Sequence, residues 1–359
     1  MGLVRLFLAL VVAVDHWRVI VLHEQSIFLD DIVKFGFNAG YAVMFFYVIS
    51  GFLITYTLTR NYKRDRSGLA AFYSNRFIRI FSLYWPMVIL AFLFVASAWP
   101  KFVAASLPDK FTAIFLIGQD WRLAFGSYPT PYGGGAISGL HQAWTLGAEL
   151  TFYLMAPLFI RSWKIGGVVL IASFALRAFF VFRNGTDVQE VWTYAFVGST
   201  YGFFMLGHLA CLFGRYLANR WLGVALTVAS FAVMHYGGSY ASFDTPRFWV
   251  SVVLFSVAVP GLFEATKNVR WMNALGDLSY PVYLVHTLVL ILFGPWLLNS
   301  ALSFRESLGP LGAGYLSLVA FSVACVLAAA LVHRFLEIPT TWAMRTALQG
   351  WKTLPSPQR

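Results

Sequence analysis

The sequence predicts an all-α, polytopic membrane protein with about ten transmembrane helices and both termini in the cytoplasm. Of its 359 residues 59% are apolar and only 11% are charged, whereas soluble proteins average about 45–50% and about 25%. The mean hydropathy is +0.69, and a soluble domain of this length could not bury so much apolar surface in one core. This composition excludes soluble, disordered, fibrous and nucleic-acid-binding proteins, in spite of the net charge of +11.

Ten stretches of the chain are apolar over roughly the 20 residues that a transmembrane helix needs. They lie near residues 3–22, 36–58, 74–97, 144–160, 165–182, 192–213, 221–237, 248–264, 275–298 and 311–332. No internal repeat or appended soluble domain is visible between them. We therefore predict one transmembrane domain over residues 1–340, followed by a short cytoplasmic tail over 341–359.

The first stretch, Leu3 to Leu22, differs from a signal peptide because Asp15, His16 and Arg18 occupy its core and cleavage region. It predicts a transmembrane helix that carries polar residues. Arg5 and His16 are 11 positions apart, which is about three turns and roughly 16 Å of rise, so they share one face. Arg5 at the mouth of this helix can hold a phosphate, and a buried histidine suits a general base. The alternative is a snorkelling arginine and a core histidine bonded to a neighbouring helix.

The second and third stretches carry small and basic residues. Ser50-Gly51 lies inside the second, where small residues permit close approach of two helices, an explanation that we favour over catalysis. Arg76 and Arg79 are i and i+3 at the inner end of the third, so both guanidinium groups lie on one face. Such a pair predicts an anion clamp for the phosphates of a cytoplasmic cofactor or donor. A positive-inside anchor with aromatic belt residues would look similar.

A long segment, residues 98–143, separates the third and fourth stretches and contains several glycines and prolines. Loops of this length are usually functional or mobile. Its apolar part, residues 111–117, is compatible with an element that re-enters the membrane.

Glu149 is an acidic residue one to two turns inside the outer end of the fourth stretch. Ionisable residues inside membrane spans are costly and mark candidate functional sites. Counted from the outer surface, Glu149 lies at a depth similar to that of His16. A carboxylate and an imidazole at one level predict an acid–base pair or an oriented dyad. The alternative is a structural ion pair that ties two helices together.

The later stretches offer fewer candidates. Cys211 and Cys325 lie in apolar runs and are interpreted as small buried hydrophobic residues. In the ninth stretch Pro281 should kink its helix, and His286 lies near mid-membrane, where it could line the same cavity as His16. The histidines have no i, i+4 pairing and the chain has no HExxH, P-loop or GxSxG motif, so we expect no metal site.

The distribution of basic residues sets the predicted orientation. If the N-terminus is cytoplasmic, 17 of the 26 lysines and arginines fall in inside segments, six of them in the loop over residues 59–79. The outside segments hold eight basic residues, diluted by nine acidic ones. This asymmetry is the one that cytoplasmic loops display, and it accounts for the net charge without a nucleic acid partner.

The order of these signals resembles that of the acyltransferase family 3 proteins, the integral-membrane O-acyltransferases of bacterial surface glycans. The matching blocks extend from residue 3 to about residue 340. They are Arg5-x10-His16, Phe45-Phe46 with Ser50-Gly51-Phe52-Leu53, Phe72-Tyr73-x2-Arg76-x2-Arg79, Trp144-Thr145-Leu146-x2-Glu149-x2-Phe152-Tyr153, Gly276-x2-Ser279-Tyr280-x2-Tyr283-x2-His286 and Glu337-x-Pro339. A chance assembly of six blocks in this order is implausible.

The resemblance implies transfer of an acyl group, usually acetyl, from cytoplasmic acyl-CoA to a hydroxyl of a glycan or glycolipid at or beyond the outer face. It implies His16 as the general base, Glu149 as a supporting acid–base or orienting carboxylate, and Arg5, Arg76 and Arg79 as ligands of the CoA phosphates. Hydroxyls such as those of Tyr47, Ser50 and Tyr280 are candidates to steady the oxyanion. The expected location is the bacterial inner membrane, with acyl-CoA as a donor substrate and no permanently bound cofactor.

Three other functions fit parts of the pattern. A family member could act on a lipid-linked, antibiotic or other small-molecule acceptor. A proton-coupled transporter or flippase would also bury His and Glu, but the inverted repeats typical of transporters are not seen. A structural scaffold is disfavoured, because it has no need for buried Arg, His and Glu in this order.

Overall fold

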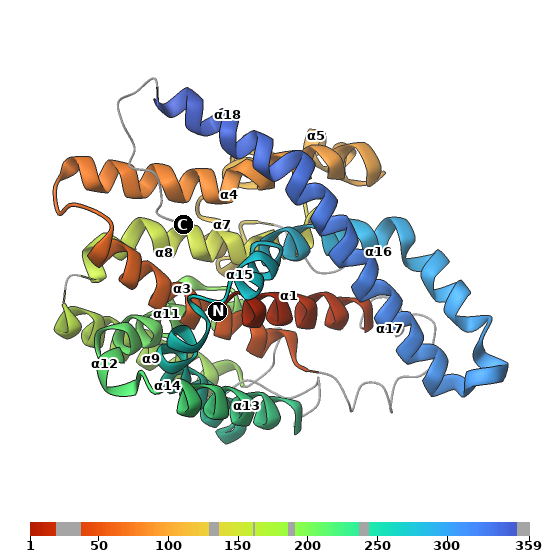
Figure 1. The fold of residues 1–359 in the computed structure, drawn as a ribbon. Coiled ribbons are helices and arrows are strands. Elements are labelled where there is room, and N and C mark those ends of the chain that lie inside the picture. Colours follow the sequence, from red (N-terminus) through yellow and green to blue (C-terminus); the bar gives the residue numbers. More distant parts are fainter. Residues whose placement is uncertain (19–36, 129–135, 161, 186–190, 237–243, 350–359) are drawn as a thin grey trace.

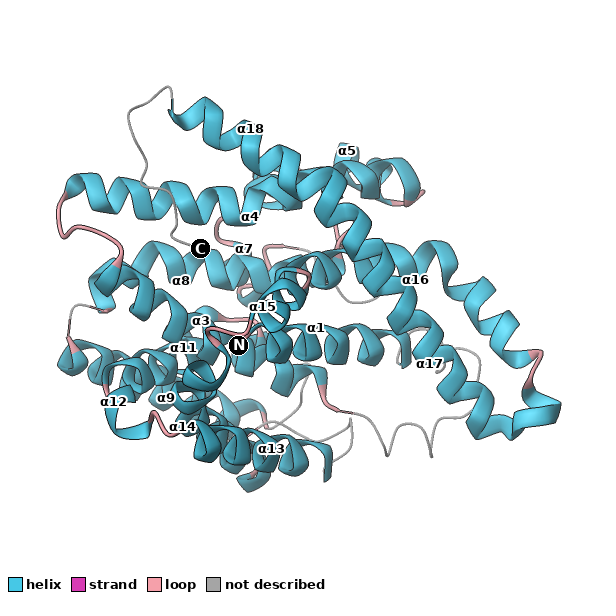
Figure 2. Cartoon of the chain, viewed as in Figure 1, coloured by secondary structure: helices cyan, strands magenta, loops and turns pink. Residues whose placement is uncertain are grey.

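The computed structural model of the protein describes residues 1–18, 37–128, 136–160, 162–185, 191–236 and 244–349. This described part is built from helices and contains no strand, as Figure 2 shows. The all-α prediction is therefore confirmed.

The first half of the chain supplies five long helices and a group of short ones in the described residues. Their bounds are α1 Gly2–His16, α3 Ala39–Arg60, α4 Arg66–Phe94, α5 Ala98–Ala104, α6 Leu107–Phe115, α7 Gln119–Ala124, the 3₁₀ turn η3 His141–Ala143, α8 Trp144–Phe159 and α9 Trp163–Asn184.

The second half is formed by helices that mostly pack as antiparallel neighbours (Figure 1). Their bounds are α10 Val191–Tyr194, α11 Val197–Leu212, α12 Gly214–Leu217, α13 Arg220–Tyr236, α14 Pro246–Thr266, α15 Arg270–Asp277, α16 Ser279–Leu302, α17 Arg305–Val332, the π-helical turn η4 His333–Glu337 and α18 Ile338–Gln349.

Seven helices or runs of consecutive helices in the described part are long and apolar enough to cross a membrane. They are Ala39–Arg60, Arg66–Phe94, Trp163–Asn184, Val191–Leu212, Pro246–Thr266, Arg270–Leu302 and Leu311–Leu348. The other three predicted spans coincide with α1, α8 and α13, which have 15, 16 and 17 residues. Residues 19–22 of the first predicted span lie outside the described residues. The count of ten and the side of the termini stay predictions.

Polar side chains define where several of these helices begin. Asn38 and Asp65 accept hydrogen bonds from the backbone amides of Tyr41 (3.2 Å) and Gly68 (2.8 Å) at the starts of α3 and α4. Such N-caps satisfy amides that have no partner inside the helix. The sequence thus specifies the first residues of the two helices that carry Ser50, Arg76 and Arg79.

Helix α3 is buried along most of its length and packs closely on α11. A Cβ atom on Gly51 would lie 1.9 Å from the carbonyl oxygen of Phe204, and one on Gly207 would lie 1.9 Å from that of Val48. Only glycine permits two backbones to approach in this way. The packing interpretation of Gly51 is therefore correct, while Ser50 beside it faces another helix.

Helices α16 and α17 form a long hairpin at one edge of the molecule (Figure 1). Val319, Val323 and Leu327 lie on one face of α17 and are 60%, 52% and 61% exposed. An apolar face of this kind is what a helix presents to lipid.

The structure differs from two local predictions. The segment 98–143 is not a simple loop, because α5, α6 and α7 occupy part of it, and Tyr84 and Trp85 of α4 donate hydrogen bonds to the carbonyls of Ala113 (2.5 Å) and Ile114 (3.0 Å). Pro281 does not kink a continuous helix: α15 ends at Asp277, α16 starts at Ser279, and Pro281 lies in the first turn of α16, where its missing N–H costs little.

Candidate active site

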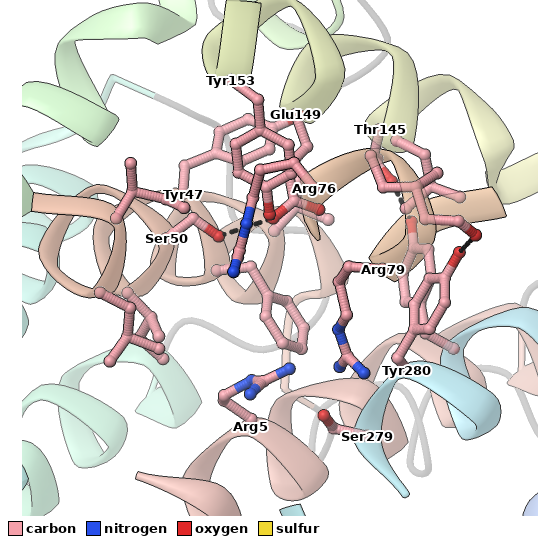
Figure 3. A pocket seen from close by; sticks show the side chains of 18 residues that line it. Arg5, Tyr47, Ser50, Arg76, Arg79, Thr145, Glu149, Tyr153, Ser279 and Tyr280 are labelled. Carbon is pink, nitrogen blue, oxygen red and sulfur yellow. Dashed lines mark hydrogen bonds between the residues drawn. The ribbon is translucent and has the colours of Figure 1, made fainter. Parts of the chain in front are cut away.

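A cavity of about 150 Å³ opens between α1, α3, α4, α8 and α16. Apolar side chains of α3 line one wall, and the polar lining consists of Arg5, Tyr47, Ser50, Arg76, Arg79, Thr145, Glu149, Tyr153, Ser279, Tyr280 and Tyr283. Figure 3 shows that the charged groups converge on this space from several helices.

Four of the five predicted site residues line this one cavity. Arg5 comes from α1, Arg76 and Arg79 from one face of α4, and Glu149 from α8. Three guanidinium groups and one carboxylate leave an excess of positive charge in a cavity walled by helices. Such a site suits an anionic ligand with several phosphate oxygens.

Arg5 reaches the cavity because the start of α1 lies directly on α15. A Cβ atom on Gly2 would be 2.0 Å from the carbonyl oxygen of Met272 and 2.9 Å from Cα of Gly276. The close approach brings the first turn of α1 beside the first turn of α16. In the described part of the chain the Arg5 side chain has no hydrogen bond or ion pair, so its five donors are available to a ligand.

Arg79 is held by the C-terminal part of the chain. Its Nη1 atom is 3.1 Å from Oε1 of Glu337, and Oε2 of Glu337 is 2.6 Å from Nδ1 of His333. The guanidinium also lies 5.2 Å from the centre of the Tyr280 ring, within the range of a cation–π contact. The π-helical turn η4, which carries Glu337, therefore orients this arginine.

Unlike Arg79, Arg76 has only aromatic partners in the described part of the chain. Its guanidinium lies 5.7 Å from the ring centre of Tyr153 and 6.0 Å from that of Phe72. Its Nε atom is buried and has no hydrogen-bond partner in the described structure. A buried donor without a partner is costly. Because Arg76 lines the cavity, a bound ligand could supply the missing hydrogen-bond acceptor.

Glu149 accepts two hydrogen bonds inside the cavity. Oγ of Ser50 donates to its Oε1 atom at 2.9 Å, and the hydroxyl of Tyr153 donates to the same atom. Ser50 therefore combines with Gly51 to give α3 one residue for packing and one for the site. Tyr153 is a site residue that the sequence indicates only as part of the motif around Glu149.

His16 lies apart from the cavity. Its Nδ1 atom is 2.9 Å from Nε2 of His286, and the two ring centres are 5.1 Å apart. The ring of Tyr283, which lines the cavity, stands 5.9 Å from that of His286. Tyr283 thus lies next to both the cavity and the histidine pair.

The predicted pairing of His16 with Glu149 is not formed among the described residues. Gln142, just before α8, donates to the carbonyl of Leu284 at 2.9 Å and accepts from Thr287 at 2.5 Å, so it lies level with His286. Glu149 is seven residues further along the chain, or about 10 Å of helical rise. The sequence estimate failed because it counted depth from the outer surface, whereas α8 begins at the level of the histidine pair.

A hydrogen-bonded link connects the cavity with that level. Oγ1 of Thr145 is 2.5 Å from the hydroxyl of Tyr283, and this hydroxyl donates to the carbonyl of Gln142 at 3.2 Å. These contacts fix α8 against α16 between the cavity and His286. Within the described ranges no group of three or more His, Cys, Asp or Glu residues is placed to hold a metal ion.

Comparisons with known proteins match the part of the chain that contains the site. A family model described as an acyltransferase domain matches residues 1–333. Nodulation protein 10 of Rhizobium leguminosarum bv. viciae is 29% identical over 269 residues, 69% of this chain and 71% of the relative. Acyltransferase MdmB of Streptomyces mycarofaciens is 25% identical over 368 residues, 93% of this chain and 89% of the relative.

A third relative matches a smaller part. Peptidoglycan O-acetyltransferase OatA of Listeria monocytogenes is 27% identical over 117 residues, which are 32% of this chain and 18% of that protein. No solved structure matches the chain.

Proposed function

The chain belongs to the acyltransferase family 3 and is a membrane-integral O-acyltransferase, and we propose that it transfers an acyl group from cytoplasmic acyl-CoA to a hydroxyl of a surface glycan. The proposed donor is acetyl-CoA. The observation that carries the proposal is the convergence of Arg5, Arg76 and Arg79 on one cavity. The proposed location is the bacterial inner membrane.

The three arginines supply what the nucleotide end of CoA requires. CoA carries a diphosphate and a 3′-phosphate, and guanidinium groups bind such oxygens in a forked geometry. The predicted orientation puts the N-terminus of α1 and the start of α4 on the cytoplasmic side. His16 is about 16 Å of helical rise beyond Arg5, so the extended pantetheine arm would carry the thioester from the cavity toward the histidine pair.

His16 is proposed to act as the general base. The imidazole takes the proton of the acceptor hydroxyl while the oxygen forms a bond to the thioester carbonyl carbon. The tetrahedral intermediate then collapses, the C–S bond breaks, and the protonated imidazole returns its proton to the departing CoA thiolate. General base catalysis of this kind contributes about 10²–10⁴ in rate.

Glu149 is proposed to orient groups at the donor side. Its contacts with Ser50 and Tyr153 hold two hydroxyls in the cavity, and its charge balances part of the arginine cluster. In this position it organises the donor site and does not exchange a proton with His16.

The acceptor is the part of the proposal that the relatives constrain least. The relative named for peptidoglycan matches over 117 residues, whereas the two that match over most of this chain have no acceptor in their names. A small-molecule hydroxyl is therefore the second candidate. Assays with an isolated surface glycan fraction and with small polyhydroxy compounds distinguish the two.

The experiment that tests the proposed function follows radiolabelled acetyl-CoA in sealed membrane vesicles. Acetyl groups supplied to the cytoplasmic face should appear on the glycan fraction with the wild-type protein and not with His16→Ala at matched expression. The control is His208→Ala. His208 is also buried, but its Nδ1 atom is 3.0 Å from Oγ1 of Thr55, and neither residue lines the cavity. Full activity of His16→Ala would overturn the proposal.

A further inference from the structure

The two histidines at the end of the site form an asymmetric pair. Nδ1 of His16 faces Nε2 of His286 at 2.9 Å. The His286 side chain is completely buried, whereas His16 is partly exposed. Nε2 of His16 has no hydrogen-bond partner in the described part of the chain, so it is the nitrogen that an acceptor hydroxyl can approach.

The second nitrogen of His286 decides where the protons lie. Its Nδ1 atom is 3.3 Å from the carbonyl oxygen of Val282. A carbonyl oxygen only accepts hydrogen bonds, so Nδ1 of His286 carries a proton. No acidic side chain is hydrogen-bonded to this buried ring in the described structure, and an added charge would therefore be uncompensated. His286 is accordingly neutral, with a lone pair on Nε2.

The tautomer of His16 follows from that of His286. Because Nε2 of His286 has a lone pair, Nδ1 of His16 must be the donor between the two rings. A neutral His16 with a proton on Nδ1 has its lone pair on Nε2, which is the open nitrogen. The hydrogen bond at one ring nitrogen thus determines which nitrogen is free to act as a base.

We propose that His286 is a positioning residue that keeps His16 in the tautomer required of a general base. The proposal rests on the proposed function, in which His16 takes the proton of the acceptor hydroxyl. When His16 becomes protonated, its Nδ1–H bond to His286 becomes charge-assisted and stronger. His286, anchored on the Val282 carbonyl, therefore does for His16 what a carboxylate does for the histidine of a catalytic triad.

The surrounding contacts hold His286 in place. Gln142 donates to the carbonyls of Tyr283 (3.2 Å) and Leu284 (2.9 Å), and Thr287 donates back to Gln142 at 2.5 Å. These contacts lie on both sides of His286 along α16. A rigid helix at this point is what a positioning residue needs.

Two substitutions separate positioning from structural support. His286→Phe keeps a planar ring but removes the acceptor, whereas His286→Gln places an amide oxygen near the position of Nε2 and can still accept from His16. His208→Phe is the matched control, because it removes another buried, hydrogen-bonded histidine. Each variant is purified in nanodiscs, its folding is checked by thermal unfolding, and acetyl transfer to the glycan fraction is measured against acetyl-CoA concentration.

We expect His286→Phe to lower kcat by about 10–100-fold, the range found when the partner that orients a metal-binding histidine is removed. KM for acetyl-CoA should not change, because the arginine cavity is intact. His286→Gln should recover most of kcat, and His208→Phe should keep it.

Wild-type kcat in His286→Phe, or equal losses in the Phe and Gln variants, would overturn the positioning role. Failure of the proposed function gives a different result: wild-type protein that transfers no acetyl group, or a His16→Ala variant that remains active. The two failures are therefore distinguishable in one series of measurements.

Discussion

Replacing Arg5 with alanine should weaken the binding of CoA without affecting the fold. The Arg5 side chain lines the cavity and has no hydrogen bond or ion pair in the described part of the chain, so its removal leaves no protein group unpaired. A hydrogen bond to a charged group contributes about 1.5–3 kcal/mol. At about 1.4 kcal/mol per tenfold, the dissociation constant of CoA should rise by about 10- to 150-fold.

The assay is calorimetric titration of purified protein in nanodiscs with CoA and with dephospho-CoA, which lacks the 3′-phosphate. If Arg5 binds the 3′-phosphate, the alanine substitution should have little effect on dephospho-CoA binding; if it binds the diphosphate, both ligands should weaken equally. The control is Arg60→Ala, which removes the same charge from an exposed arginine that is hydrogen-bonded to Tyr56 at 2.9 Å and lies outside the cavity lining. Unchanged CoA affinity in Arg5→Ala would refute the assignment of the cavity to the donor.

Three further predictions concern the cavity and its frame. Glu149→Gln removes a negative charge beside the arginines, so CoA should bind more tightly by about 1 kcal/mol, or about fivefold, while kcat falls; weaker binding in the titration would contradict this. Glu337→Gln should lower the unfolding free energy by about 1–3 kcal/mol, because the ion pair with Arg79 is lost. The double variant with Arg79→Ala should lose less unfolding free energy than the sum of the two single losses. Full additivity in thermal unfolding would exclude the coupling. Gly51→Ala should destabilise the protein by about 1–3 kcal/mol or more, because its Cβ would overlap a backbone carbonyl of α11. Gly167→Ala adds a Cβ that meets open space beside α9, so it should stabilise the protein by about 0.5–1 kcal/mol. Equal unfolding temperatures for the two variants would refute the packing argument.

The helices could be predicted from the sequence because membrane helices follow local rules. Each predicted span coincides with a helix in the described residues, since apolar length alone specifies a span. The short helices α5, α6 and α7 were not predicted, because helices of six to nine residues have no distinctive apolar period and depend on tertiary contacts.

Part of the site could be predicted for a similar reason. The i, i+3 spacing of Arg76 and Arg79 fixes their common face, and the cost of charge in a membrane singled out Arg5 and Glu149. The contacts that organise these residues are not local: Arg79 meets Glu337 across 258 positions of the chain, and His16 meets His286 across 270. No spacing rule relates residues so far apart, so the partners of Arg79 and His16 became visible only in the structure.

The depth of Glu149 shows how a reasonable local rule fails. Counting turns from the outer end of a span assumes that every helix starts at the same surface. Helix α8 starts level with His286, as the contacts of Gln142 show. Glu149 consequently lines the arginine cavity, and the neighbour of His16 in the structure is His286 and not Glu149.

In the proposed mechanism, donor binding and proton transfer belong to different residues of one enzyme. The most direct test measures acetyl-CoA affinity and acetyl transfer on the same preparations of wild type, His16→Ala and Arg5→Ala. His16→Ala should bind acetyl-CoA with wild-type affinity and transfer no acetyl group, whereas Arg5→Ala should bind acetyl-CoA weakly and regain transfer at high acetyl-CoA concentration. Acetyl transfer by His16→Ala at the wild-type rate, or wild-type acetyl-CoA affinity in Arg5→Ala, would contradict this mechanism.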